Sequence, residues 1–139
     1  MIGNIASLAS HIRIARPTSR LGDLLTFYCD GLGLARIDSF EHHRGYSGVM
    51  VGLPDSHLHI EFTTHDDHAG HPLGRAPTND NLLAFYLPGP DTLSVFTERL
   101  TALGHPAVEP ENPYWLDLGA VTFEDPDGWR VVLVPSAYS

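Results

Sequence analysis

The stretch Phe123-Glu124-Asp125-Pro126-Asp127-Gly128-Trp129 contains a strong turn signal between two apolar runs. Proline presets the backbone angle at the start of a tight turn, and glycine accepts the positive φ that such turns require. The flanking residues, 118–123 and 129–134, are mostly apolar and β-branched, as strands tend to be. The sequence therefore predicts two antiparallel strands joined by a hairpin.

Upstream of this hairpin, the sequence predicts a strand, a helix and a further short strand. Residues 82–87 form an apolar run that Pro88-Gly89-Pro90 ends. Apolar residues at three- and four-residue steps then mark the buried face of a helix, which Gly104 ends. A short strand is predicted at residues 107–108. The helix face consists of Leu93, Phe96, Leu100 and Leu103.

The N-terminal half repeats this order of elements. Residues 12–15 alternate with the two-residue period of a strand, and the helix predicted after them ends at Gly31 and Gly33. Its buried face consists of Leu21, Leu24, Leu25, Tyr28 and Leu32. Strands are predicted at residues 34–40, 49–53 and 58–63, with turns at 45–48 and 54–55.

Both halves therefore consist of a strand, a proline-containing break, a helix and three strands, with Leu32-Gly33 and Leu103-Gly104 at equivalent points. Such a repeat predicts an α+β fold of two tandem βαβββ modules within one domain, residues 1–139. Module one spans about residues 9–64 and module two about 81–135, with a linker rich in Gly, Pro, His and Asp between them at about 65–80. A chance match is the alternative, since a helix followed by glycine and a strand is a common order.

The composition argues against several kinds of partner. The chain has 139 residues, 42% of them hydrophobic and 18% charged, and a formal net charge of -9. An acidic chain without a Lys/Arg cluster repels phosphate groups, so we expect no nucleic acid and no membrane as partner. The single cysteine, Cys29, excludes an intramolecular disulfide. Residues 1–10 lack the features of a signal peptide, and a cytoplasmic location is expected.

Two motifs resemble the vicinal oxygen chelate superfamily, which includes glyoxalase I, bleomycin resistance proteins and extradiol dioxygenases. Phe27-Tyr28 followed by Gly31-Leu32-Gly33-Leu34 is similar to the FY…LG helix end of that group, and residues 123–129 resemble its final hairpin, F-x-DPDG-aromatic. The resemblance is strongest to uncharacterised bacterial members. It implies half-barrel sheets around a cavity with the helices outside. It also implies a homodimer, because a half-barrel sheet leaves an edge to be covered.

Most metal-binding positions of this superfamily are replaced in the chain. When the motifs are matched, the four ligand positions fall on Arg13, Glu61, Leu82 and Val132, and only Glu61 is a usual ligand. A divalent cation needs several donors that converge on one point. If the match on the first strand is shifted by two residues, His11 replaces Arg13, and two ligands are still too few. We therefore expect no metal and no other cofactor.

Six residues are candidates for ligand binding. Glu61 shares a strand face with His57 and His59 by alternation, which makes this face either a polar binding wall or an ordinary solvated surface. Arg13 can hold a carboxylate or phosphate, or it can pair with Glu61. The aromatic loop at residues 111–115 suits a flat ligand or fills the core. The candidates are Arg13, His59, Glu61, Tyr86, Tyr114 and Trp115, with Glu61 also the candidate catalytic residue.

Other polar residues favour structural roles. Arg16, like Arg13, can hold a ligand carboxylate or phosphate, but pairing with Glu61 or with surface acids is the favoured interpretation. His65, His68 and His71 recur every three residues, but they lie in a loop with no rigid element to fix metal geometry. Cys29 lies beside an aspartate, which argues against a reactive thiol.

Two functions follow, and the sequence leaves both open. The first is metal-independent binding or sequestration of a small molecule in the half-barrel cavity, similar to the bleomycin resistance proteins. The second is a glyoxalase- or dioxygenase-like enzyme, a lyase or oxidoreductase, acting on a small oxygenated compound. Glu61 would be its general base or the one retained metal ligand. A protein-interaction module with an exposed apolar patch is a third hypothesis. Neither the ligand nor the pairing of modules within or between chains follows from the sequence.

Overall fold

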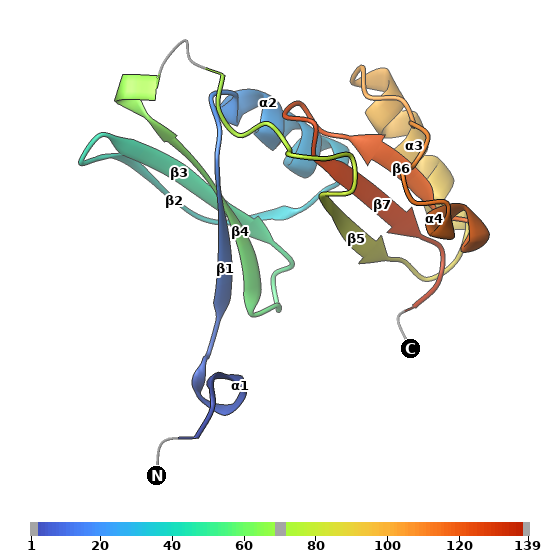
Figure 1. The fold of residues 1–139 in the computed structure, drawn as a ribbon, viewed down its shortest axis with the longest axis horizontal. Helices are drawn as coiled ribbons and strands as arrows, with labels where there is room; N and C mark the ends of the chain where they lie inside the picture. Colours follow the sequence, from blue (N-terminus) through green and yellow to red (C-terminus); the bar gives the residue numbers. More distant parts are fainter. Residues whose placement is uncertain (1–2, 69–71, 138–139) are drawn as a thin grey trace.

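The computed structural model describes residues 3–68 and 72–137. It contains two sheets with helices packed against them, and a short N-terminal helix that projects away from the body (Figure 1). This is the predicted α+β architecture of two tandem modules. The first sheet contains β1 (Ile12–Pro17), β2 (Ala35–His43), β3 (Tyr46–Gly52) and β4 (Leu58–His65), and the second contains β5 (Leu82–Tyr86), β6 (Val121–Glu124) and β7 (Arg130–Val134). The helices are α1 (Ile5–Leu8), α2 (Leu21–Leu25), η1 (Thr26–Gly31), η2 (Asp66–His68), α3 (Asp91–Ala102) and α4 (Tyr114–Asp117).

The first sheet has the strand order β1-β4-β3-β2. β1 runs parallel to β4, and β3 is antiparallel to both of its neighbours. Successive residues of a strand point to opposite faces, so Val49, Val51, Ile60 and Phe62 all point toward the helical segment α2–η1. They form one core with the buried helix residues Leu24, Phe27 and Tyr28. This core fixes which face of the sheet the helices leave uncovered.

The predicted helix at residues 21–32 is one α-helical turn followed by a wider π-helical turn, η1. The π turn buries Phe27, Tyr28 and Gly31. A Cβ added to Gly31 would lie 2.5 Å from the side chain of Leu100 in α3, so glycine is what allows the helices of the two modules to approach. No helix in the described residues has both the length and the apolar character needed to cross a bilayer.

The turn predicted at residues 45–48 is wrong in position, because β3 already begins at Tyr46. The two residues before Tyr46, Arg44 and Gly45, have positive φ values of 53° and 87°. Positive φ at both central residues gives a hairpin turn whose twist matches that of the flanking strands. Arginine is not a typical turn residue, so the sequence does not indicate a turn at Arg44. The predicted turn therefore lies C-terminal to the observed one.

The second sheet has the order β5-β7-β6, with β5 parallel and β6 antiparallel to β7. The Asp-Pro-Asp-Gly hairpin joins β6 to β7 as predicted. The short strand predicted at residues 107–108 is reduced to a single bridge, between Val108 and Thr122. Pro106 and Pro110 flank this bridge, and proline cannot donate a ladder hydrogen bond, so pairing cannot extend in either direction.

Both faces of β7 are buried. Val131 and Leu133 belong to the core shared with the helices, whereas Val132 lies on the opposite face by alternation and is still 0% exposed. Arg130, on the same face as Val132, donates from Nη1 to the backbone oxygen of Glu109 at 3.0 Å. In addition, α4 contacts β6. The segment between α3 and β6 therefore closes this face of the second sheet.

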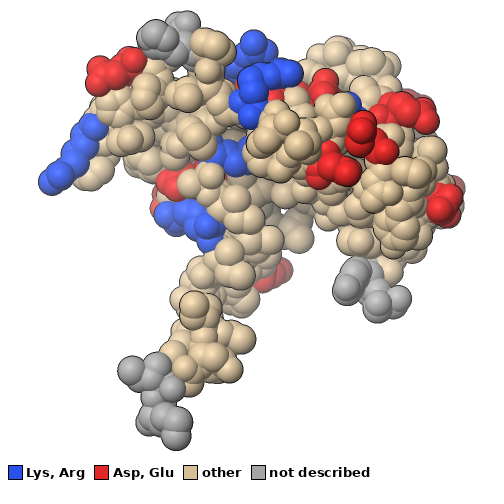
Figure 2. All heavy atoms as spheres, viewed as in Figure 1, with Lys and Arg blue, Asp and Glu red and all other residues tan. Residues whose placement is uncertain are grey.

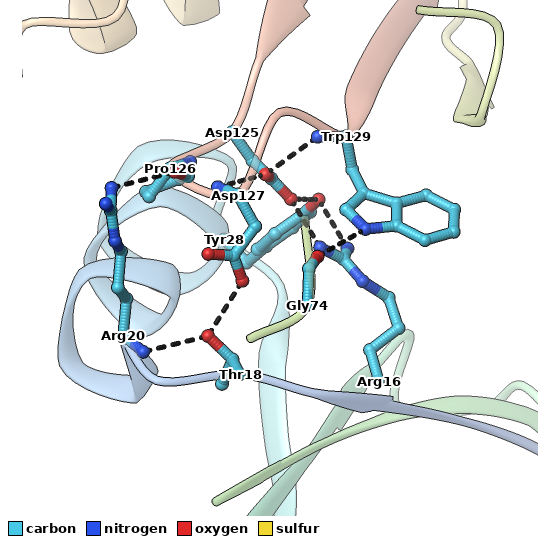
Figure 3. Close-up of polar contacts among 9 residues, drawn as sticks. All are labelled: Arg16, Thr18, Arg20, Tyr28, Gly74, Asp125, Pro126, Asp127 and Trp129. Carbon is cyan, nitrogen blue, oxygen red and sulfur yellow. Dashed lines mark hydrogen bonds and ion pairs between the residues drawn. The ribbon is translucent and has the colours of Figure 1, made fainter. Parts of the chain in front are cut away.

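A buried polar network joins the two modules (Figure 3). Arg16 of β1 donates from Nη2 to Oδ2 of Asp125 at 2.9 Å and from Nη1 to the hydroxyl of Tyr28 at 3.2 Å. The Tyr28 hydroxyl donates in turn to the same carboxylate oxygen at 2.6 Å. Because Arg16 is 7% and Asp125 3% exposed, the pair is almost fully desolvated. The prediction that Arg16 pairs with Glu61 or a surface acid is therefore wrong.

The second aspartate of the hairpin and the linker extend this network. The Thr18 hydroxyl donates to Asp127 at 2.7 Å, and Trp129 donates from Nε1 to the backbone oxygen of Gly74 at 3.0 Å (Figure 3). Gly74 has a φ of 84°, and a Cβ there would overlap the backbone oxygen of Pro17. Only glycine fits this contact. The described part of the predicted linker is thus held against the hairpin.

Candidate functional site

The helices leave one face of the first sheet uncovered, which we call the open face. Across the β1–β4 ladder, Arg13 pairs with His59 and Ala15 with Glu61. Residues that pair across neighbouring strands point to the same side of a sheet, here the side opposite to the helix core. Arg13 is exposed, and His59 and Glu61 are half-buried. The structure therefore brings together three of the predicted ligand-binding residues.

A hollow of about 420 Å³ lies on the open face toward the α1 end of the sheet. This volume falls within the usual range of small-molecule pockets, roughly 300–1,000 Å³. One part of the lining is polar and another is apolar. The polar side chains are His11, Arg13, Asp38 and His59, and the apolar ones include Ile37 and Met50. Such a lining suits a molecule with a charged end and a short apolar body.

An irregularity in β2 shapes this hollow. The register between β2 and β3 shifts between Arg36 and Asp38, so Ile37 is an extra residue in the ladder. A bulge of this kind re-aims side chains, and here the consecutive residues Ile37 and Asp38 both line the hollow. Sequence reasoning missed both residues, because a bulge leaves no signal in a two-residue period. Met50 was also missed. It lies between Val49 and Val51, which point toward the helices, so alternation directs Met50 to the open face.

Arg13 and Glu61 do not pair with each other. In the described part of the chain, neither side chain has a hydrogen bond or an ion pair with another residue. Within the sheet, Glu61 lies between Ala15 and Met50. The alternative in which Arg13 neutralises Glu61 is therefore wrong. Both charged groups are left available to a ligand.

Three imidazole rings lie beside Arg13 on the open face. The ring centroid of His11 is 5.4 Å from that of His57 and 6.0 Å from that of His59. The Ser10 hydroxyl lies 2.9 Å from Nδ1 of His11. A neutral imidazole can donate one hydrogen bond and accept another, so this group extends the polar side of the hollow.

The three aromatic candidates lie with the second sheet. Tyr86 belongs to β5, and Tyr114 and Trp115 belong to α4, where their rings form an edge contact at 5.2 Å. The predicted aromatic loop is therefore in part a helical turn, within the segment that closes the second sheet. The structure does not place these residues in the hollow beside Arg13, and their role in ligand binding stays a prediction.

The histidines of the linker lie at the other end of β4. The rings of His65 and His68 are 5.2 Å apart, and Nδ1 of His65 is 3.7 Å from Oδ2 of Asp67. His71 lies outside the described residues. Elsewhere, burial raises the pKa of Cys29, and the nearby Arg36 lowers it in part. A thiol with a raised pKa stays protonated, which fits the prediction that Cys29 is unreactive.

The donor set does not suit the metal ion of the superfamily. Of the four matched positions, Glu61 supplies a carboxylate, Arg13 a cation, and Leu82 and Val132 no donor at all. Leu82 and Val132 also lie on the second sheet, where Val132 is fully buried. Within residues 3–68 and 72–137, no three His, Cys, Asp or Glu side chains are arranged to hold a metal. We therefore assign no step of any reaction to a bound cation.

The two tandem modules, with their four-stranded and three-stranded sheets, and the Asp-Pro-Asp-Gly hairpin define a member of the vicinal oxygen chelate superfamily. Within it, the chain belongs to the YycE-like family: residues 12–63 match the YycE-like N-terminal domain and residues 80–135 the YycE-like C-terminal domain. The chain is 48% identical over 128 residues to the uncharacterized protein YycE of Bacillus subtilis strain 168, covering 92% of this chain and 89% of that protein.

Solved structures show the same fold. A YycE protein of unknown function from Bacillus subtilis, described as a candidate glyoxalase/fosfomycin resistance protein, matches with a TM-score of 0.85 and 46% identity over 94% of this chain and 93% of that one. Glyoxalase I of Leishmania major matches with a TM-score of 0.64 and 15% identity, over 89% and 84% of the two chains. TnmS3, an antibiotic binding protein from Streptomyces, matches with a TM-score of 0.62 and 19% identity, over 93% and 98%. At this low sequence identity, the similarity to glyoxalase I and to TnmS3 concerns the fold alone.

Proposed function

We propose that this chain binds a small anionic molecule on the open face of the first sheet, without a metal ion. The observation that carries the proposal is the guanidinium of Arg13, which has no partner among residues 3–68 and 72–137 and lines a hollow of about 420 Å³. A guanidinium holds a carboxylate, phosphate or phosphonate through two parallel hydrogen bonds. Met50 and Ile37 offer apolar surface to the remainder of the ligand.

The polar neighbours of Arg13 support an anionic ligand. His11 and His59 add donors on the same face. The one carboxylate in the hollow, Asp38, accepts a hydrogen bond from the backbone of Ser39 at 2.8 Å and forms no ion pair with Arg13. The binding role also agrees with a fold relative that is named an antibiotic binding protein.

Isothermal titration with three matched probes tests the proposal. Phenylphosphonate, benzyl alcohol and benzylamine share an aromatic body and differ in charge. In buffer with EDTA, phenylphosphonate should bind most tightly, with one site per chain. Arg13→Met should weaken it by roughly tenfold to a hundredfold, since a charged hydrogen bond contributes about 1.5–3 kcal/mol.

Arg44→Met is the control, because Arg44 is an exposed arginine on the β2–β3 turn. It should bind phenylphosphonate as the native protein does. Preferred binding of benzylamine, or equal loss of affinity in the two variants, would contradict the proposal.

A second candidate function is catalysis with Glu61 as general base. The observation that favours it is the position of Glu61 between Ala15 and Met50, where no cationic side chain of the described residues pairs with it. A carboxylate of this kind can take a proton from a bound carbonyl compound. If the chain is an enzyme, proton NMR will show slow conversion of a bound carbonyl compound. Glu61→Gln should stop the conversion with little change in affinity, whereas equal loss of both indicates a role in binding only.

A further inference from the structure

A second hollow, of about 390 Å³, adjoins the hollow at Arg13. It lies between the N-terminal arm, residues 3–12, and the turn that precedes β4, and we call it the arm hollow. Its apolar lining comes from the arm and from the start of β4: Ile5, Ala6, Ala9, Ile12 and Leu58. His11 and Ile12 line both hollows, so a ligand bound at Arg13 can extend along the arm.

The arm hollow is uncharged and exposes apolar side chains. Among the described residues, its lining contains no Asp, Glu, Lys or Arg. Figure 1 shows α1 beyond the end of β1, and Figure 2 shows the arm without charged side chains, in agreement with the sequence of residues 3–12. Ile5 is 81% exposed, Ile12 60% and Leu58 45%. Exposed apolar surface of this kind marks a contact with an apolar group.

The helical turn α1 has little packing of its own. None of its residues is buried. Its local hydrogen bonds are a side-chain cap, in which the backbone of Ser7 donates to Oδ1 of Asn4 at 3.0 Å, and a bond from the backbone of Ala9 to the oxygen of Ile5 at 2.9 Å. A helix this short is marginal in water, because few hydrogen bonds offset the cost of nucleation. An apolar group in the arm hollow would add the burial that α1 lacks.

We propose that the ligand is a single-chain anionic amphiphile, whose acidic head binds Arg13 and whose linear alkyl tail lies in the arm hollow. The inference rests on the proposed function, which supplies the site of the head. Ala9 and Arg13 are four residues apart, so their Cα atoms are separated by at most about 14 Å, since extended backbone advances about 3.3–3.6 Å per residue. An alkyl tail of medium length covers this distance. Ile12 and His11 lie along its path.

Charge favours a free amphiphile over a lipid bilayer. A helix that binds an anionic membrane normally carries Lys or Arg, and the arm has none. The formal net charge of -9 also repels an anionic surface. The cation of the joined hollows is Arg13, at the end away from α1, so a molecule with one acidic end and one apolar end matches both parts.

Isothermal titration with methylphosphonate, butylphosphonate and octylphosphonate measures the contribution of the tail, because the three probes share one head group. Each is used as a monomer in buffer with EDTA. Affinity should rise from the methyl to the octyl probe by roughly twofold to fourfold for each buried methylene group, and Arg13→Met should weaken all three. Binding of phenylphosphonate without a gain from methyl to octyl would overturn this inference alone. If no phosphonate binds in a way that depends on Arg13, the proposed function fails as well.

Ile5→Ser and Leu8→Ser are a matched pair of variants. Both side chains are exposed on the same helical turn, but Leu8 does not line the arm hollow. Ile5→Ser should weaken octylphosphonate by roughly threefold to tenfold and leave methylphosphonate unchanged. Leu8→Ser should leave the affinity for both probes unchanged. Equal loss of octylphosphonate affinity in the two variants, or no loss in either, would overturn the inference.

An ¹⁵N NMR titration shows where the tail lies. Octylphosphonate should shift the amides of Ile5, Ala9 and Leu58 and slow hydrogen exchange in α1, whereas methylphosphonate should leave these amides unchanged. Shifts of the octyl probe that map to β5 instead would contradict the inference. So would a ligand-free dimer that Ile5→Ser and Leu8→Ser both dissociate, or binding of the arm to vesicles of phosphatidylcholine and phosphatidylglycerol, because a second copy or a bilayer would then cover the arm.

Discussion

Arg16 and Asp125 are 109 residues apart in the sequence and form a buried ion pair, with Nη2 2.9 Å from Oδ2. One residue comes from the first strand and the other from the last hairpin, so the pair fixes the two modules relative to each other. The guanidinium is also packed between two rings, with its central carbon 5.1 Å from the centroid of Phe62 and 4.5 Å from that of Trp129. A motif that identifies the superfamily in sequence thus has a structural role at a distance from the open face.

Removal of one partner of this pair should destabilise the protein strongly. Arg16→Met leaves the carboxylate of Asp125 buried without its cation, which typically lowers the free energy of unfolding by about 3–5 kcal/mol. Urea denaturation measures the change. Arg13→Met is the control, because Arg13 is exposed and pairs with no side chain in the described part of the chain. The free energy of unfolding of this variant should stay within about 0.5 kcal/mol of the native value. Equal stability of the two variants would show that the pair does not hold the modules together.

Stability should fall in alkali because of Tyr28. Burial, together with the neighbouring charge of Asp125, raises the pKa of Tyr28 well above its ordinary value of about 10. Between the ordinary pKa of about 10 and the raised pKa, the unfolded chain releases the phenolic proton and the folded chain keeps it. The free energy of unfolding should therefore decrease as pH rises above about 10, by up to about 1.4 kcal/mol per pH unit.

Tyr28→Phe should flatten this alkaline decrease, although it also removes the hydrogen bond to Asp125. Chemical denaturation between pH 8 and 11 measures the slope. Both proteins should carry Cys29→Ser, because the raised pKa of Cys29 acts in the same direction from a lower pH. An unchanged slope in the Phe variant would mean that Tyr28 ionises as easily in the folded state as in the unfolded chain.

The closed face of the second sheet gives a further prediction. Val132 is 0% exposed under the segment that precedes β6, so Val132→Glu places a charge in a site without a partner. The free energy of unfolding should drop by more than about 3 kcal/mol, or the segment should open. Hydrogen exchange at residues 109–120 distinguishes these results. A fully stable variant with normal protection would show that this face is not closed.

Glycine at position 74 should be required for the contact between linker and hairpin. Gly74→Ala places a Cβ against the backbone oxygen of Pro17 at a residue with a φ of 84°. We expect a loss of about 1–3 kcal/mol in the free energy of unfolding. Gly22→Ala is the matched control, since nothing lies near its added Cβ and alanine favours the helix. If both variants are equally stable, the linker is not fixed at this point.

The sequence predicted the elements that follow regular periods, and it missed those that depend on contacts between distant residues. Both helices, the final hairpin and the shared face of Arg13, His59 and Glu61 follow from spacing alone. The bulge at Ile37 and the helical turn at Tyr114 interrupt a regular period, so they left no signal. Ion pairs were equally hard to predict, because Asp125 could be recognised as a turn residue but not as the partner of Arg16.

The metal prediction also combines what the sequence states directly with what depends on contacts between distant residues. The residues at the positions matched to the superfamily's metal ligands can be read directly from the sequence. Two of them, Leu82 and Val132, supply no donor. What covers Val132 could not be inferred, because the covering segment differs from its counterpart in the first module. The resemblance matches Val132 to a metal-ligand position, but it does not show that this segment buries Val132.

Binding of an anion at the hollow beside Arg13, without a metal ion, can be observed residue by residue. The most direct measurement is an ¹⁵N-resolved NMR titration of the EDTA-treated protein with phenylphosphonate. Binding at the hollow should give saturable shifts of the amides of Arg13, Met50 and His59, and these shifts should be lost in Arg13→Met. Shifts that appear only after a divalent cation is added, or that map to the second sheet, would contradict it.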